Sequence, residues 1–148
     1  MKRKTILYSF ITIVVIIIGL VYFVSREYNR KHKDVANVTA AFTLSTDEVI
    51  AAFSKDEKNA NAKYLDKVMS VNGTVKSLDK DDRGFYTVIL GEPNSMSSVR
   101  AVMDSSHNDE AMNLPVGKKI SIKGICTGFN ADELLGSDVI LNRCTIQQ

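Results

Sequence analysis

The sequence predicts a mainly β protein, a small five-stranded barrel preceded by an amphipathic helix, with one N-terminal transmembrane helix. Three observations lead to this prediction: a charge-free run near the N-terminus, a change from helical to strand periodicity after Lys67, and a glycine-containing strand motif that occurs twice. The expected segments are a transmembrane anchor over 1–25, a juxtamembrane linker over 26–44, and a helix-plus-barrel domain over 45–148.

The charge-free run is "ILYSFITIVVIIIGLVYFV", from Ile6 to Val24. At about 1.5 Å per residue, a helix of this length spans roughly 30 Å, the thickness of a bilayer's hydrocarbon core. The run is longer than the apolar part of a signal peptide, no small-x-small cleavage site precedes Ser25, and no cysteine lies nearby to carry a lipid. We therefore favour an uncleaved anchor over a cleaved signal peptide or a buried core helix.

Basic residues flank the anchor on both sides, so the positive-inside rule is nearly balanced. The first three, Lys2, Arg3 and Lys4, form a short tail of the kind that usually stays in the cytoplasm. We therefore expect a single-pass protein whose folded domain lies on the side of the membrane opposite the cytoplasm.

Charge is distributed unevenly along the chain. The first 33 residues hold seven Lys and Arg and one acid, which leaves 12 basic and 16 acidic residues for 34–148, a net charge of −4. The basic character thus belongs to the anchor, where it can meet anionic headgroups. The mildly acidic domain disfavours nucleic acid as a partner.

The segment "STDEVIAAFSKDEKNANAKYL" predicts one helix over 45–65. Ser45 and Glu48 have the spacing of a capping box at its start. The apolar residues keep to one face, as packing against a domain requires: Val49, Phe53, Ala60 and Tyr64.

Five segments with alternating apolar residues follow and predict five strands: "VMSVNGTVKSL", "GFYTVILG", "SVRAVMD", "KKISIKGICTG" and "SDVILNRCTI". The first and fourth share the pattern apolar-Ser-apolar-x-Gly-x-apolar, with Gly73 and Gly124 at the glycine position. Glycine inside a strand is typical of a sharp bend or a close backbone approach. A five-stranded barrel of the OB type requires such bends, and its first and fourth strands are neighbours. We therefore interpret both as structural glycines.

The order of these segments resembles the tRNA_anti-like OB-fold family of small bacterial proteins, which are often membrane-anchored or lipoproteins. The resemblance covers roughly 44–146. Its most specific part is Gly-x-Cys-x-Gly followed by Asp-Val-x-Leu-x-x-Cys, here Gly124, Cys126, Gly128, Asp138, Val139, Leu141 and Cys144. It implies an OB barrel in which Gly128 is also structural, in a protein of a bacterial cell membrane. Together with the cytoplasmic N-terminus expected from the basic tail, this places the domain in the periplasm or outside the cell.

The family's name implies nucleic-acid binding, but a fold does not fix a function. OB proteins bind ligands on the second and third strands and their flanking loops. That face offers Lys76, Arg83, Phe85, Tyr86 and Arg100 as a candidate binding face, beside acidic loops and without any tryptophan. We expect a membrane-tethered, non-enzymatic binding module for a protein or a small ligand; the alternative is a protein that binds single-stranded nucleic acid.

No motif predicts catalysis, a metal or a cofactor. The two histidines, His32 and His107, lie in polar segments. The two cysteines are eighteen positions apart, without the CxxC spacing typical of zinc or redox sites.

Cys126 and Cys144 are expected to form a disulfide that joins the fourth and fifth strands, because the hairpin between them brings them nearly opposite one another. Keeping Val139, Leu141 and Cys144 all inward also requires a bulge near 142–143. The alternative is a pair of buried free thiols.

Overall fold

The computed structural model describes residues 19–22, 34–132 and 136–147. The chain divides into two compact units, Met1–Lys33 and Asp34–Gln148. In the first unit the short stretch 19–22 is helical, and the remainder of the predicted anchor lies outside the described residues. Within the part of the chain that is described, no helix is both long and apolar enough to cross a bilayer.

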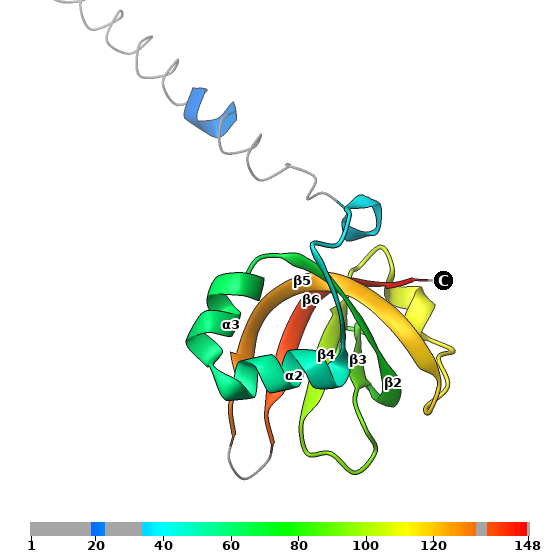
Figure 1. Cartoon of the computed structure of the whole chain (residues 1–148). Coiled ribbons are helices and arrows are strands. Elements are labelled where there is room, and N and C mark those ends of the chain that lie inside the picture. The colour runs from blue at the N-terminus through cyan, green and yellow to red at the C-terminus, as the bar shows by residue number, and fades with distance from the viewer. Residues whose placement is uncertain (1–18, 23–33, 133–135, 148) are drawn as a thin grey trace, which may run out of the picture. The chain divides into compact units, whose positions relative to one another are not determined.

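The second unit is built around a closed five-stranded barrel (Figure 1). Its strands are β2 (Val68–Lys80), β3 (Tyr86–Leu90), β4 (Ser98–Met103), β5 (Lys119–Asn130) and β6 (Asp138–Gln147). They follow the order β2-β3-β4-β6-β5, and β5 pairs with β2 to close the barrel. The β4–β6 pair is parallel and the other pairs of the barrel are antiparallel. The five predicted strands, and the pairing of the first with the fourth, are confirmed.

Alternate residues of each strand fill the barrel interior. Their side chains are almost fully buried: Met69, Val71, Val75, Val88, Leu90, Val99, Ala101, Met103, Ile122, Cys126, Val139, Leu141 and Cys144. Burying one large aliphatic side chain contributes about 1.5–3 kcal/mol, so this alternation stabilises the barrel.

The predicted single helix over 45–65 is wrong in one respect, since the segment forms two helices. These are α2 (Thr46–Lys55) and α3 (Glu57–Tyr64), separated at Asp56. The carboxylate of Asp56 accepts a hydrogen bond from the Asn59 N–H at 3.0 Å and so caps the new helix. The expected capping box of Ser45 and Glu48 is present at the start of α2.

Helix α2 crosses the barrel, with α3 beyond it at the side of β5 (Figure 1). Two residues of its apolar face, Val49 and Phe53, are 0% and 1% exposed. The ring of Phe53 stacks on Phe129 of β5 with 5.1 Å between ring centroids. The helix therefore belongs to the barrel core, as its amphipathic pattern predicted.

A segment that the sequence placed in the linker is also folded. It contains the 3-10 turn η1 (Val35–Asn37) and the strand β1 (Phe42–Ser45), which runs parallel to the start of β2. The compact domain thus begins at Asp34, ahead of the boundary expected at 45.

The bulge expected near 142–143 is confirmed. Ile125 of β5 pairs with Asn142, whereas Lys123 pairs with Thr145, so β6 carries an extra residue between the two pairs. Arg143 lies there with a φ of +58°. The bulge turns Leu141 and Cys144 toward the same interior.

The predicted disulfide is wrong, because Cys126 and Cys144 are both buried free thiols. Strand register explains the difference. Cys126 pairs with Leu141, while Cys144 lies against Gly124, where an ideal Cβ would come within 2.5 Å of the Cys144 sulfur. Burial raises the pKa of both thiols, which keeps them protonated.

The glycines of the repeated motif lie where other side chains approach closely. A Cβ at Gly73 would overlap Oγ1 of Thr46 and lie 3.2 Å from Cβ of Leu90. Gly128 lies at a second irregularity of the β5–β6 pairing, with a φ of +156°.

Candidate functional site

The expected binding face on β3 and β4 carries one central cation, Arg100. Its guanidinium lies 3.2 Å from a carboxylate oxygen of Asp79 on β2 and 3.9 Å from one of Asp138 on β6. The positive charge of Arg100 is therefore paired with two acids and is less available to the phosphates of a nucleic acid.

The other residues of that prediction are spread along the hairpin formed by β2 and β3. Lys76 lies near one end, where its ammonium donates a hydrogen bond to the Ser95 carbonyl. Arg83 and Phe85 lie in the turn at the other end, and Phe85 is only 37% exposed. Tyr86 is half-buried, with the Lys80 ammonium 4.9 Å from its ring centroid. The structure therefore does not gather them into one open cationic and aromatic surface.

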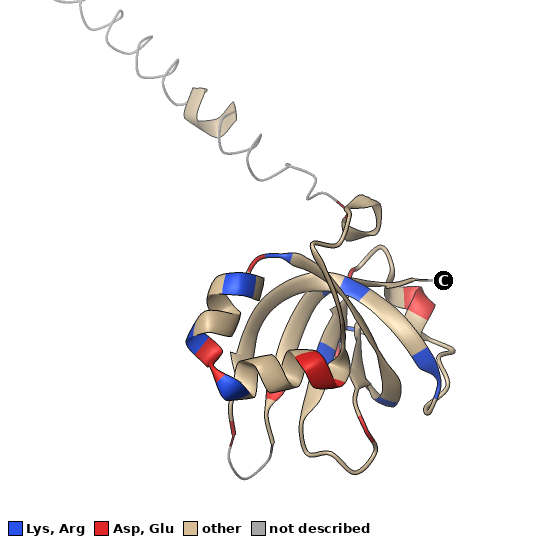
Figure 2. Ribbon diagram, viewed as in Figure 1, with Lys and Arg blue, Asp and Glu red and all other residues tan. Residues whose placement is uncertain are grey.

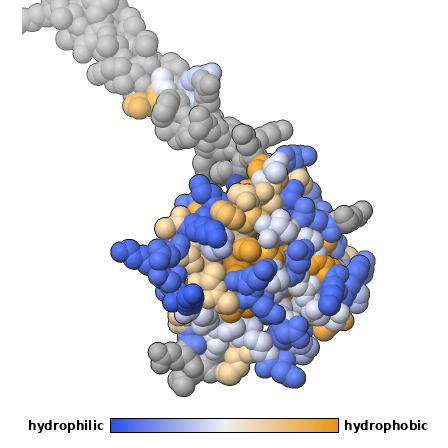
Figure 3. Space-filling view, in the orientation of Figure 1, coloured by the Kyte–Doolittle hydropathy of each residue, from blue (hydrophilic) through white to orange (hydrophobic). Residues whose placement is uncertain are grey.

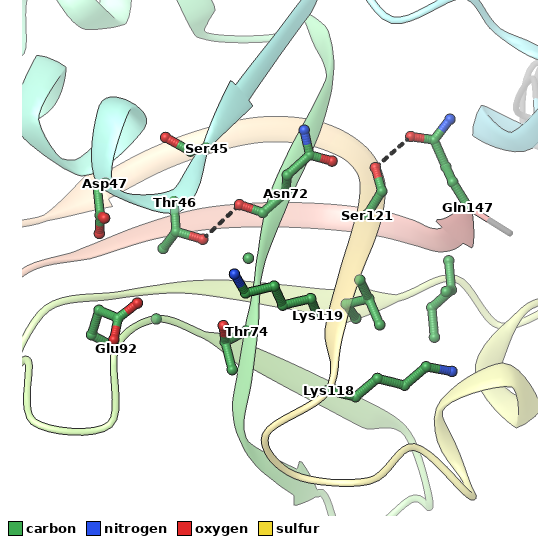
Figure 4. Close-up of a pocket in the computed structure, with 14 residues that line it drawn as sticks. Ser45, Thr46, Asp47, Asn72, Thr74, Glu92, Lys118, Lys119, Ser121 and Gln147 are labelled. Atoms are coloured by element: carbon green, nitrogen blue, oxygen red, sulfur yellow. Dashed lines mark hydrogen bonds between the residues drawn. The ribbon is translucent and has the colours of Figure 1, made fainter.

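A groove of about 660 Å³ lies elsewhere on the domain, at the start of α2 (Figure 4). The middle of β2, the start of β5, the end of β6 and the loop after β3 complete its walls. None of the predicted site residues lines it except Gly73, which was predicted as a structural residue.

The groove exists because β2 changes partners along its length. Its first half pairs with β5 as far as Thr74 and Lys119, and its second half pairs with β3 from Val75 onward. At this crossing the lack of a side chain on Gly73 lets Thr46 approach, and Thr46 Oγ1 donates a hydrogen bond to the Asn72 carbonyl at 3.1 Å. The start of α2 is thereby fixed beside the crossing.

Four charged side chains line the groove: Asp47, Glu92, Lys118 and Lys119. All four are exposed, and none has a hydrogen bond or ion pair to another described residue. In Figure 4 the two acids lie on one side, Lys119 in the middle and Lys118 on the other side. The groove thus has an acidic end and a basic end with free charges at both.

Between these charges the groove offers uncharged hydrogen-bonding groups over a partly apolar surface. Ser121 Oγ donates a hydrogen bond to Oε1 of Gln147 at 3.0 Å. Side chains of Ile120 and Ile146 contribute apolar surface. No aromatic residue occurs among those that line the groove, so it lacks a platform for stacking bases.

Charge and hydropathy on the face seen in Figures 2 and 3 agree with this mixed character. Basic and acidic residues alternate along the ribbon, and neither sign covers the face. Hydrophobic surface shows in the middle of the domain, bordered by hydrophilic residues.

No histidine or cysteine occurs among the residues that line the groove. His107 is engaged with Asp34 and Glu110 and is not among the lining residues. Across the described ranges, no three His, Cys, Asp or Glu side chains gather in a way that could hold a metal ion.

Comparison with known proteins identifies the family of this chain. The chain matches the tRNA_anti-like family over residues 1–145 and therefore belongs to it. The family's OB barrel is the fold observed here. A search of curated proteins found no significant match.

Among solved structures, the chain is similar to a protein from Klebsiella pneumoniae described as a "putative nucleic acid-binding lipoprotein". The TM-score is 0.58 at 16% identity, covering 80% of this chain and 100% of the other. An aspartyl-tRNA synthetase from Entamoeba histolytica also matches, with a TM-score of 0.43 at 10% identity, covering 79% of this chain and 23% of the synthetase. At 16% identity, the likeness to the Klebsiella protein shows the fold alone.

Proposed function

We propose that this protein is a membrane-tethered, non-enzymatic OB-fold module, and that its groove binds an extended peptide segment carrying charges of both signs. The observation that carries the proposal is the set of four side-chain charges around the groove without a partner among the described residues: the two acids at one end, Lys119 in the middle and Lys118 at the other end. A ligand of complementary charge gains ion pairs there without breaking any existing pair of the described residues.

The size and lining of the groove support a peptide. Its volume lies within the range of about 300–1,000 Å³ that is typical of ligand sites. The side chains of Asn72, Thr74 and Ser121 offer both donors and acceptors, which suit the N–H and carbonyl groups of a peptide backbone. Apolar surface from Ile120 and Ile146 suits the carbon atoms of its side chains.

The proposed tether rests on the charge-free run from Ile6 to Val24, which is long enough to cross a bilayer. We place the domain in the bacterial periplasm or outside the cell because the short basic tail before the run favours a cytoplasmic N-terminus. A reporter that is active only outside the cytoplasm, fused to the C-terminus, tests this. Activity is expected, and an inactive fusion that is nevertheless stably produced in the membrane would reverse the orientation.

Single-stranded nucleic acid is the second candidate ligand. Lys118 and Lys119 favour it, as does the description of the Klebsiella protein. Against it stand the net charge of −4 over 34–148, the acids beside Arg100 and the absence of an aromatic side chain from the groove lining.

One paired experiment separates the two ligands. The full chain in detergent is used to select from a random peptide library, and the same sample is titrated with a labelled, mixed-sequence single-stranded oligonucleotide at physiological salt. We expect enrichment of peptides with both acidic and basic residues, and no binding of the oligonucleotide at micromolar concentration. Micromolar or tighter binding that weakens steeply with salt would replace the peptide proposal with the nucleic-acid one.

A further inference from the structure

The ring of His107 lies between two carboxylates from distant parts of the chain. Its Nδ1 is 2.7 Å from Oε1 of Glu110, in the 3-10 turn η2 (Asn108–Ala111), and its Nε2 is 3.0 Å from Oδ1 of Asp34. Asp34 is the first residue of the folded domain. The ring therefore joins the start of the domain to the connection between β4 and β5.

This geometry requires a proton on each ring nitrogen. Ionised carboxylates only accept hydrogen bonds, and a neutral imidazole has a single N–H, so it can satisfy one of the two acids at a time. The second Glu110 oxygen accepts the backbone N–H of Ile146 at 2.7 Å, which holds that carboxylate in place. Only imidazolium completes both contacts.

Three further contacts fix the segment that follows Asp34. Val35 is 3% exposed. The buried Lys123 of β5 donates hydrogen bonds to the carbonyls of Ala36 and Val38, at 2.8 and 3.0 Å. The next backbone bond to the barrel is from the Ala41 N–H to the Val68 carbonyl. The segment 34–38 is thus held by His107 at its beginning and by Lys123 at its end.

We propose that Asp34, His107 and Glu110 form a proton-dependent clasp that holds the segment 34–38 against the barrel and opens when His107 loses its second proton. If the chain is anchored as proposed above, full opening, in which Val35 and the two Lys123 hydrogen bonds are also released, lengthens the free connection by roughly seven residues, or roughly 25 Å when extended. The clasp would then control how far the domain reaches from the membrane.

The charges around the ring set the direction of the response. Partial burial lowers the pKa of His107, but its hydrogen bonds and charge interactions with Glu110 and Asp34 outweigh this effect and raise the pKa above its ordinary value of 6.5. Asp104, after β4, and Arg143 of β6 also lie nearby, 3.9 Å from one another. A raised folded-state pKa means that the clasp is closed below about pH 6.5 and is lost as the pH rises through the folded-state value.

Hydrogen exchange of the full chain in detergent tests the clasp without requiring a ligand or a membrane. Exchange of peptides that cover 34–38 is measured at about pH 5.5 and about pH 8.5 and corrected for intrinsic rates, with barrel peptides as the internal reference. For each pH unit by which folding raises the pKa of His107, the protection of 34–38 should fall roughly tenfold between about pH 5.5 and about pH 8.5. Protection of the barrel is expected to stay constant.

Three variants complete the test. His107→Gln is expected to expose the segment at both pH values, while His32→Gln, at the only other histidine, keeps the wild-type response. Asp34→Asn retains the ability to cap η1 but removes the charge, so its pH response should shrink. The clasp is refuted if wild-type protection of 34–38 is the same at both pH values, or if His107→Gln retains the pH response. Neither outcome bears on the peptide groove.

Discussion

Two surfaces of this barrel differ in what their charged residues do. On the face of β3 and β4, where OB proteins commonly bind, Arg100 is paired with Asp79 and Asp138. In the groove at the start of α2, the charged groups of Asp47, Glu92, Lys118 and Lys119 have no hydrogen bond or ion pair to another described residue. Charges on the first surface stabilise the domain, whereas those on the second are free to meet a ligand.

The comparison shows that the residue types on a surface do not by themselves identify a binding site. The β3–β4 face has the cationic and aromatic residues that led us to expect a binding face there, but its central cation is already paired with two acids. The sequence alone did not indicate the groove, because its walls come from five segments that are distant in the sequence. Four substitutions test this difference between the two surfaces. The first, at Gly124, lies outside both and provides a reference.

Gly124→Val is expected to have the largest effect. Its Cβ would come within 2.5 Å of the Cys144 sulfur and 3.2 Å of Leu141 Cβ, in the closed β5–β6 part of the barrel. We expect a loss of about 3 kcal/mol in the free energy of unfolding, measured by chemical denaturation. Thr43→Val, at an exposed position of β1, is the control. If the glycine variant unfolds like the control, the close approach is not what requires glycine.

Gly73→Val should lower the free energy of unfolding by less, about 2 kcal/mol. The added atoms would meet the Thr46 side chain, which can move by displacing the start of α2, together with Leu90. Since Gly73 also lines the groove, this variant should lose peptide binding even where it is folded. Unchanged stability, or unchanged peptide binding by the folded variant, would show that the crossing on β2 does not shape the site.

Arg100→Gln and Lys119→Gln compare the two surfaces directly. Losing Arg100 leaves two acids unpaired and should lower stability by up to about 1 kcal/mol, the range of exposed ion pairs. The ammonium of Lys119 has no hydrogen bond or ion pair to another described residue, so its replacement should change the free energy of unfolding by no more than about 0.5 kcal/mol. Denaturation curves at low and high salt provide the measurement, and the Arg100 difference should shrink with salt. If Lys119→Gln lost more stability than Arg100→Gln, Lys119 would be the paired charge and Arg100 the free one.

The sequence was sufficient to predict the five strands, their apolar faces and the bulge on β6, since these follow from local alternation. It also indicated where glycine matters, at Gly73 and Gly124. It could not predict the break at Asp56, where capping by a side chain competes with continuing the helix. The missing disulfide has a similar origin, because the register pairs Cys126 with Leu141 and places Cys144 beside Gly124, two positions before Cys126.

The candidate site was less predictable than the fold. Lys118 and Lys119 are adjacent in the sequence, but nothing local indicates that Asp47 and Glu92 face the same groove. The clasp at His107 likewise depends on Asp34, which lies 73 positions away. Such sites follow from the topology of the barrel, which places separate loops and strand ends together.

The central claim is that the groove, and not the β3–β4 face, binds the ligand. The most direct test is a calorimetric titration of the tightest selected peptide against the wild-type chain, Lys119→Glu and Arg100→Gln. We expect Lys119→Glu to weaken peptide binding by about tenfold or more, a change of about 1.4 kcal/mol, and Arg100→Gln to change it by less than about twofold. If Arg100→Gln weakens binding and Lys119→Glu has no effect, the peptide binds at the β3–β4 face and not in the groove.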